Sequence, residues 1–333
     1  MFNLSRLIPA RKQKQPRIEA VMITMDRSPK GNHLADSIKG LAESGFFQHP
    51  SFNFTLIHSG QNRLNLDEAL AVSDNFTLVE TGRLLQFNEA VLNALKTALA
   101  NKSDVVLFME DDIRVSTSFP QYVLDTLESA GGAEPVLDFV TYYVEVTDSY
   151  FQGEQFIEME AKSFYGSQCY AMNADYAASF AKFIEENNPQ KTGFCDVWFH
   201  DWLVHEKLEP VVKCAVPSGA QHIGRNSNQG HDYIEAPCVK DEVEQTRPFR
   251  TSQYSQVETD DESLTIRNNE TNKLLSLNSS AHLIYLFCDG EYSLKQIISE
   301  IHAEVGGSRH KLDAEIRRGL FELKSLGVVD YQT

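Results

Sequence analysis

The hydrophobic pattern of the first half of the chain alternates between short apolar runs and segments with helical spacing. The apolar runs of strand length lie at residues 19–25, 52–58 and 105–109. The segments with helical spacing lie at residues 35–44, 87–100 and 119–129, the last ended by Gly131 and Gly132. This alternation predicts βαβ units and therefore a mainly parallel, Rossmann-like α/β sheet with helices on both faces.

The same pattern continues more weakly beyond residue 130. We predict a further strand at Leu137 to Val146 and a helix beginning near Asn173. A polar stretch between them carries four aromatic side chains, Tyr150, Phe151, Phe156 and Tyr165. These rings could form either a wall on the acceptor side of a substrate site or simply part of the core.

The run from Val105 to Ser116 is the first candidate for chemistry. Its apolar first half is typical of a strand buried on both faces, and it stops at three adjacent acids, Glu110, Asp111 and Asp112. Ligands of open α/β sheets bind beyond the carboxyl ends of the strands. Clustered carboxylates there favour a hard divalent cation, Mn²⁺ or Mg²⁺, that also binds substrate phosphates. The alternative is a solvated acidic turn.

The first strand is followed by no glycine-rich phosphate loop, which disfavours a dinucleotide-binding or P-loop enzyme. Thr24, Asp26 and Arg27 stand at its end instead. They could contact the base or ribose of a nucleotide, or they could form an ordinary polar loop.

A second candidate region runs from Thr192 to Ser227. Asp196 and Asp201 lie close in sequence to the two tryptophans of the chain. An acid packed against indole rings would be partly desolvated and therefore a better proton acceptor. The two acids are five residues apart, so on one helix only one of them would face the reaction, and Asp196 could be a helix cap instead. His222 and Arg225 are candidates for metal or diphosphate contacts, although a single His is more often structural.

The periodicity fades between residues 232 and 251, which we interpret as a linker. Beyond it we predict two strands joined by a turn and then three helices, at residues 264–267, 273–277, 281–288, 293–305 and 311–326, with Asn278 or Ser279 as a cap. This α+β domain has apolar positions for a core of its own and no catalytic cluster, which indicates a binding module.

Composition narrows the choice of function. The chain has 333 residues, 42% of them hydrophobic, which is enough for two domains, and a net charge of −17 argues against a nucleic-acid partner. Five cysteines without C-x-x-C spacing indicate neither a zinc site nor a disulfide framework, and favour a cytoplasmic protein. No apolar run is long enough to span a bilayer. The basic arm at residues 1–16 is either a frayed terminus or a contact for lipid or a partner.

Residues 17–231 resemble the glycosyltransferase A (GT-A) fold, and more narrowly the Golgi N-acetylglucosaminyltransferases, through Met109 to Val115, Asp201-Trp202 and Gly224-Arg225. The resemblance implies a UDP-sugar donor and inversion at the anomeric carbon. It also implies Asp112 as the direct Mn²⁺ ligand, Glu110 and Asp111 as uridine and ribose contacts or outer ligands, and Asp201 as the base. His200 departs from the family pattern, and Asp196-Val197-Trp198 offers a competing alignment for the base. Bacterial lipopolysaccharide glycosyltransferases are a looser match.

Residues 252–333 resemble the PqqD family of winged-helix-like recognition elements for ribosomal peptide precursors. The similarity is carried by Leu275 to Ala281, Asp289-Gly290 and Ser293 to Ile297. It implies that a leader peptide adds as a strand beside the segment Lys273, Leu274, Leu275, Ser276 and Leu277. Such binding takes its affinity from main-chain hydrogen bonds.

Together these patterns predict a metal-dependent glycosyltransferase that modifies a ribosomally made peptide. The expected domains are a GT-A domain at 17–231 and a peptide-binding domain at 252–333. One alternative is a glycosyltransferase acting on a polysaccharide or lipopolysaccharide, and another is a peptide chaperone without catalysis.

Overall fold

The computed structural model describes residues 15–25, 33–143, 146–187, 195–224, 235–259, 263–306 and 309–332. The described chain forms two compact units. One contains Thr147–Glu154 and the residues from Lys240 onward, and the other contains the remaining described residues up to Val239. We call them the C-terminal unit and the N-terminal unit. No described helix has the length and apolar character needed to cross a membrane.

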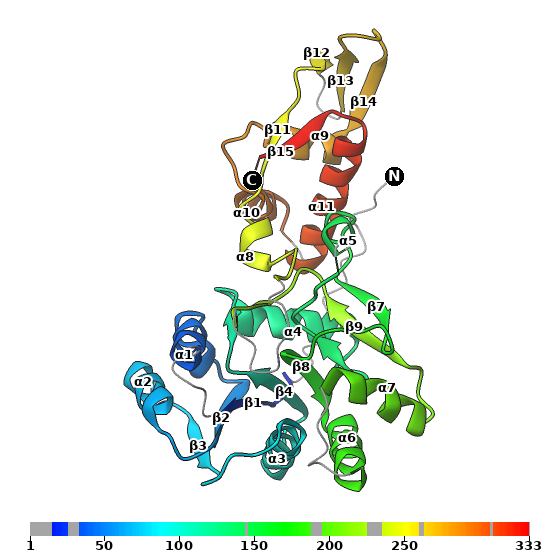
Figure 1. Ribbon diagram of the computed structural model, residues 1–333. Coiled ribbons are helices and arrows are strands. Elements are labelled where there is room, and N and C mark those ends of the chain that lie inside the picture. Colours follow the sequence, from blue (N-terminus) through cyan, green and yellow to red (C-terminus); the bar gives the residue numbers. More distant parts are fainter. Residues whose placement is uncertain are drawn as a thin grey trace. The chain divides into compact units, whose positions relative to one another are not determined.

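Among the described residues, eight strands form the sheet of the N-terminal unit, in the order β3-β2-β1-β4-β8-β6-β9-β7 (Figure 1). The strands are β1 (Ile18–Met25), β2 (Phe52–Ser59), β3 (Thr77–Glu80), β4 (Val105–Glu110), β6 (Leu137–Asp138), β7 (Phe156–Glu160), β8 (Cys169–Asn173) and β9 (Val211–Ala215). Strands β7 and β8 run opposite to the others. The sheet is therefore mixed but mainly parallel, as the sequence predicts.

Helices cover both faces of this sheet because each has one apolar side. The helices are α1 (Leu34–Glu43), α2 (Leu64–Val72), α3 (Phe87–Ala100), α4 (Phe119–Ala130), α6 (Ala174–Glu186) and α7 (Cys195–His205). Residues of α1, α2 and α4 pack into the core on one face. Residues of α3, α6 and α7 pack into the core on the other, and Figure 1 shows α1 and α3 on different sides of β1 and β2. Helix α4 ends at Gly131, which adopts the left-handed conformation with φ 74°.

A short antiparallel pair lies beside the end of β4. Strand β5 (Ile113–Val115) pairs with β10 (Ala220–His222), so that His222 lies opposite Ile113. This pairing brings together two segments that are more than a hundred residues apart in the chain. The acids that end β4 therefore lie next to the loop that follows β10.

The C-terminal unit combines a small sheet with three main helices. Its elements include β12 (Tyr254–Thr259), β13 (Ser263–Asn268), β14 (Leu274–Asn278), α9 (Ser279–Leu286), α10 (Leu294–Val305) and α11 (Arg309–Ser325). Strands β11 (Arg247–Arg250) and β15 (Val329–Gln332) form a second antiparallel pair, and α8 (Lys240–Val243) precedes β11. Of the two predicted cap candidates, Asn278 is the cap, because its side chain accepts from the Ala281 amide. Ser293 and Gln296 also form a capping box at the start of α10.

The predicted fold class is confirmed, but the strand predicted at 137–146 is much too long. Among the described residues of this range, only Leu137–Asp138 form a strand. The Asp138 carboxylate then accepts from the Val140 amide, and the Ser218 hydroxyl accepts from the Thr141 amide, so these two amides bond side chains rather than a neighbouring strand. Phe139 and Val140 are still fully buried, which explains why their apolar pattern resembles a strand.

Candidate active site

The acids at the end of β4 are largely buried. Asp111 and Asp112 are 4% and 6% exposed, and Glu110 is partly buried. The Asp111 carboxylate accepts a hydrogen bond of 2.6 Å from the Thr24 hydroxyl at the end of β1, and the Ser37 hydroxyl donates to the Asp111 carbonyl at 2.8 Å. The acids are therefore a packed part of the sheet edge, which argues against a solvated turn.

Asp112 and His222 form the centre of the candidate site. Asp112 Oδ2 lies 3.3 Å from His222 Nε2, and the Ile223 amide donates to the Asp112 carbonyl at 2.8 Å. The sequence predicts both side chains as metal contacts, and the β5–β10 pairing brings them together. Both atoms are potential metal ligands, since a carboxylate oxygen and an imidazole nitrogen each suit Mn²⁺.

The described residues could supply only some of the ligands that a bound cation needs. Within the described ranges no three His, Cys, Asp or Glu side chains are grouped so as to hold a metal ion. A cation on Asp112 and His222 would need further ligands, and these are what a diphosphate and water supply in sites of this kind. The ligand set thus fits a site that is completed by substrate, and it does not fit a closed structural metal site.

Gly224 approaches this pair so closely that a larger residue would not fit. A Cβ atom at Gly224 would lie 2.4 Å from Asp112 Oδ2 and 2.8 Å from His222 Nε2. The Asp112 side chain is 8% exposed and that of His222 is 17% exposed, so neither has much room to move away. The glycine therefore shapes the space around the two candidate ligands.

We expect Gly224→Ala to weaken Mn²⁺ binding by about 10- to 100-fold, as displacing the surroundings of metal ligands commonly does. Isothermal titration with MnCl₂ would measure this. Gly40→Ala is the matched control, because a Cβ there meets Val115 at an ordinary 3.8 Å. Equal Mn²⁺ affinity in the two variants would contradict the assignment of the site.

Tyr142 is a site residue that the sequence reasoning missed. Burial raises the pKa of its phenol, and the negative charges of Asp138, Glu110 and Asp112 raise it further. The Tyr142 hydroxyl donates to the Gln168 side chain at 3.2 Å, and the Gln168 carbonyl accepts from the Glu110 amide. The tyrosine is thus a neutral hydrogen-bonding group near the acids. No signal in the sequence indicated this role, because Tyr142 lay inside the strand predicted at 137–146.

Two buried thiols near this edge are poor nucleophiles. Burial raises the pKa of Cys169 and of Cys214 well above the ordinary range, and Asp138 raises both further. A thiol held in its protonated form is unreactive. Nucleophilic catalysis by these cysteines is therefore disfavoured.

The predicted base lies on α7, but its environment differs from the prediction. Trp202 is fully buried, and its indole donates to the Ser179 hydroxyl at 3.0 Å. Asp201 is exposed, so the expected desolvation against the indole rings is wrong for this residue. On this helix Phe199, Trp202 and Leu203 occupy the buried side, which leaves Asp201 on the outer side. Its role as the base stays a prediction.

Several predicted site residues lie outside the described residues. They are Asp26, Arg27 and Arg225, together with the side chain of Asp196, whose backbone belongs to α7. Their roles stay predictions.

The C-terminal unit presents an open strand edge. Strand β14 pairs with β13 on one side, and it has no strand partner on the other side within the described chain. Lys273, Leu274 and Ser276 are exposed, Leu275 is half-buried and Leu277 is buried. An edge strand with accessible side chains is the surface that an added peptide strand requires.

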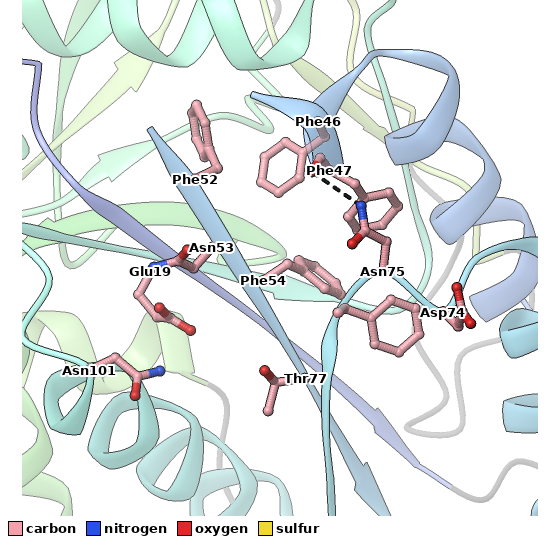
Figure 2. A pocket seen from close by; sticks show the side chains of 11 residues that line it. Glu19, Phe46, Phe47, Phe52, Asn53, Phe54, Asp74, Asn75, Thr77 and Asn101 are labelled. Carbon is pink, nitrogen blue, oxygen red and sulfur yellow. Dashed lines mark hydrogen bonds between the residues drawn. The ribbon is translucent and has the colours of Figure 1, made fainter. Parts of the chain in front are cut away.

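A separate pocket of about 670 Å³ lies at the other end of the parallel strands, among residues near the starts of β1, β2 and β3. Five phenylalanines line part of it, and Figure 2 shows the Glu19 carboxylate pointing into a polar part near Thr77 and Asn101. Glu19 is 1% exposed, and Thr55 donates to its Oε1 at 2.8 Å. Its Oε2 has no hydrogen-bond partner among the described residues. The acids lie at the opposite end of these strands, at and just after the end of β4, so this pocket is separate from the candidate active site.

Glu19→Gln is expected to raise the free energy of unfolding by about 1 kcal/mol, because a buried amide costs less to desolvate than a buried carboxylate. Urea denaturation would measure the change. The exposed Glu158→Gln is the control and should stay within about 0.5 kcal/mol of the wild type. A destabilised Glu19→Gln variant would show instead that the charge is compensated in the folded protein.

Comparison with known proteins supports the assignment of the C-terminal unit. Residues 266–329 match the family model of "Coenzyme PQQ synthesis protein D (PqqD)". The predicted resemblance to that family is thereby confirmed. No curated protein matches the chain.

Solved structures that the chain resembles include glycosyltransferases and a leader-peptide complex. Glucosyl-3-phosphoglycerate synthase from Mycobacterium tuberculosis, with Mn²⁺, UDP and its product, is 16% identical, with a TM-score of 0.42, 64% of this chain covered and 74% of that one. Mannosyltransferase PcManGT from Pyrobaculum calidifontis, with GDP-Man and Mn²⁺, is 10% identical, with a TM-score of 0.40 and coverages of 92% and 70%. TbiB1 with the TbiA(beta) leader peptide is 15% identical, with a TM-score of 0.23 and coverages of 25% and 94%. These TM-scores are too low to support any statement about the chemistry of this chain.

Proposed function

We propose that this protein is a metal-dependent glycosyltransferase that moves a sugar from a nucleotide-sugar donor, a UDP-sugar in our assignment, to a ribosomally synthesised peptide. The observation that supports the proposal best is a combination within one chain. Asp112, which is buried, and His222, which is partly buried, lie together at the carboxyl edge of an α/β sheet. The same chain carries a PqqD-matching unit with an open strand. The first feature fits a diphosphate bound with a cation, and the second fits a peptide.

In the donor site Asp112 and His222 would hold Mn²⁺ or Mg²⁺. When bound, the ion would offset negative charge on the nucleotide diphosphate as the sugar leaves. Glu110 and Asp111 lie beside this pair in sequence, and we assign them to the ribose and uridine. Thr24 keeps Asp111 in place through its hydroxyl, so its contribution to nucleotide binding is indirect.

At the acceptor, Asp201 or Asp196 would take the proton from the attacking group of the peptide. The bond from the sugar to the acceptor oxygen or sulfur forms as the bond to the diphosphate breaks, which inverts the anomeric carbon in one displacement. The buried, protonated thiols of Cys169 and Cys214 are consistent with a route that has no covalent cysteine intermediate.

In the C-terminal unit the leader would add as a strand on β14. Main-chain hydrogen bonds supply affinity in this mode of recognition, and side-chain pockets supply selectivity. A tethered leader also raises the effective concentration of the core peptide for the catalytic unit. The leader thus determines which peptides are modified, and the core supplies the acceptor group.

The test is transfer to a peptide by the purified full-length chain. The protein would be incubated with MnCl₂, a panel of UDP-sugars and precursor peptides from neighbouring small open reading frames, followed by intact-mass spectrometry. We expect a mass increase of one sugar on a leader-bearing peptide and much less on the same core without its leader. Equal transfer to both peptides would contradict leader recognition and favour a glycan acceptor. Absence of donor turnover with every UDP-sugar would contradict the enzymatic proposal.

A further inference from the structure

One short segment links the two units in an unexpected way. The chain runs from β6 to β7 in the sheet of the N-terminal unit, yet residues Thr147–Glu154 between these strands belong to the C-terminal unit. The segment contains the end of α5 (Val146–Phe151) and the turn that follows it. The chain therefore enters the C-terminal unit here as well as from Lys240 onward, and both ends of the segment continue into the N-terminal unit.

A buried arginine of α11 holds this segment. Arg317 is 1% exposed, and its Nη1 donates to the carbonyls of Tyr150 at 2.5 Å and Glu154 at 3.1 Å. Its guanidinium lies 4.4 Å from the centroid of the Tyr150 ring. The Asp313 carboxylate, one turn earlier on α11, accepts from Nε and Nη2 at 3.3 and 3.4 Å and balances the charge. The positive charge of Arg317 also interacts favourably with the negative end of the helix dipole of α5.

The segment approaches α11 too closely for any residue but glycine at one position. Gly153 has φ +84°, and a Cβ there would lie 2.6 Å from the Ala314 carbonyl oxygen. The ring of Phe151 stacks on Tyr331 with centroids 4.6 Å apart. Tyr150 and Phe151, which could have formed an acceptor wall, are therefore used for packing in the C-terminal unit.

Helix α11, which carries Arg317, is also part of the core of the C-terminal unit. Helix α11 packs on α9, and α9 packs on β13 and β14. One continuous set of contacts thus connects the open strand β14 with Arg317.

We propose that Arg317 is a positioning residue for peptide glycosylation. It holds residues 147–154 in the C-terminal unit, so that a leader bound on β14 delivers its core peptide efficiently to the catalytic unit. The inference rests on the proposed function above. In this proposal, residues 147–154 make efficient sugar transfer depend on leader binding.

The test uses the full-length chain with Arg317→Met, which keeps much of the side chain and removes the charge and donors. We expect kcat/KM for a leader-bearing peptide to fall about tenfold or more as the effective concentration is lost. The Kd of a fluorescent leader and the rate of UDP-sugar hydrolysis should stay within about twofold. Hydrogen exchange of the Gly153 and Glu154 amides should accelerate. Arg317→Lys should restore part of the coupling.

Matched variants separate positioning from damage to the fold. Arg318→Met is the first control, because this neighbour is exposed and, among the described residues, has one hydrogen bond, of 3.3 Å to the Gln152 carbonyl. Gly153→Ala attacks the same contact from the other side and should reproduce the loss. Its control is Gly290→Ala, which has a similar φ of +85° and meets only an ordinary 3.5 Å contact.

Four outcomes would count against the proposal. Unchanged peptide kcat/KM in both Arg317→Met and Gly153→Ala would show that the segment has no such role. Loss of leader affinity in parallel with transfer would show a purely structural role for Arg317. A wild-type protein that modifies no peptide would overturn the proposed function and the coupling with it. Unchanged hydrogen exchange in Arg317→Met would refute only the claim that Arg317 holds residues 147–154.

Discussion

Asparagine in place of Asp112 is expected to lower sugar transfer by about a thousandfold or more, equivalent to roughly 4 kcal/mol of transition-state stabilisation. The substitution keeps the size of the side chain and removes its charge. Asp112 Oδ2 lies 3.3 Å from His222 Nε2, so the substitution removes one of the two candidate ligands from the site. Initial rates with a UDP-sugar and increasing MnCl₂ would give the change.

In Asp112→Asn, the effect of the substitution on metal binding can be measured separately from its effect on folding. Because a ligand that binds only the folded protein stabilises it, Mn²⁺ at about 100 times its Kd should stabilise the wild type by about 2.7 kcal/mol. It should hardly affect Asp112→Asn, whose melting without metal should remain cooperative. Asp104→Asn, an exposed acid paired with Arg17, is the control. Full activity of Asp112→Asn would rule out the assigned metal site.

Regular patterns of the sequence predicted much of the N-terminal unit. The apolar run before Glu110 is β4, and the spacing of Val91, Leu92 and Leu95 gives the buried side of α3. Helix α2 and strand β3 were not predicted. Strand β3 is a short edge strand with no buried residue, so its sequence has little hydrophobic pattern. Its place in the sheet depends on pairing with β2, which is a long-range contact.

The candidate site could also be predicted only in part, because its geometry depends on long-range contacts. Asp112 was evident because a strand ends there, and His222 was suggested by its loop. The distance between them depends on the β5–β10 pairing, which no local pattern specifies. The exposure of Asp201 depends on which side of α7 packs against α6, and the alternation of acids and tryptophans did not reveal it.

The assignment of residues 147–154 lay furthest from what a sequence pattern can show. The aromatic side chains Tyr150 and Phe151 indicated burial, but their partners Arg317 and Tyr331 lie more than 160 residues later. A buried arginine in a helix is also indistinguishable in sequence from an exposed one. Composition and periodicity therefore could not reveal these contacts, and the structure was needed to show them.

Proline in place of Ser276 is expected to reduce leader-dependent transfer about a hundredfold, to the level of a leaderless peptide. The Asn268 amide donates to the Lys273 carbonyl, and Ile266 lies opposite Leu275 in the same ladder. In an antiparallel pair every second residue directs its amide away from its partner, which places the Ser276 amide on the open edge of β14. Proline removes that donor while the bonds to β13 remain. Fluorescence anisotropy of a labelled leader and intact-mass rates would measure both effects.

Two companion variants make this result specific to the main chain. Ser276→Ala removes the hydroxyl and keeps the amide, so leader affinity should change by less than about threefold if main-chain bonds carry the binding. Leu275→Pro should instead break the ladder to β13 and destabilise the whole unit, since the Leu275 amide faces that strand. UDP-sugar hydrolysis should be unaffected by Ser276→Pro, because the donor site uses none of these residues. Normal leader binding by Ser276→Pro would show that the peptide docks elsewhere than on β14.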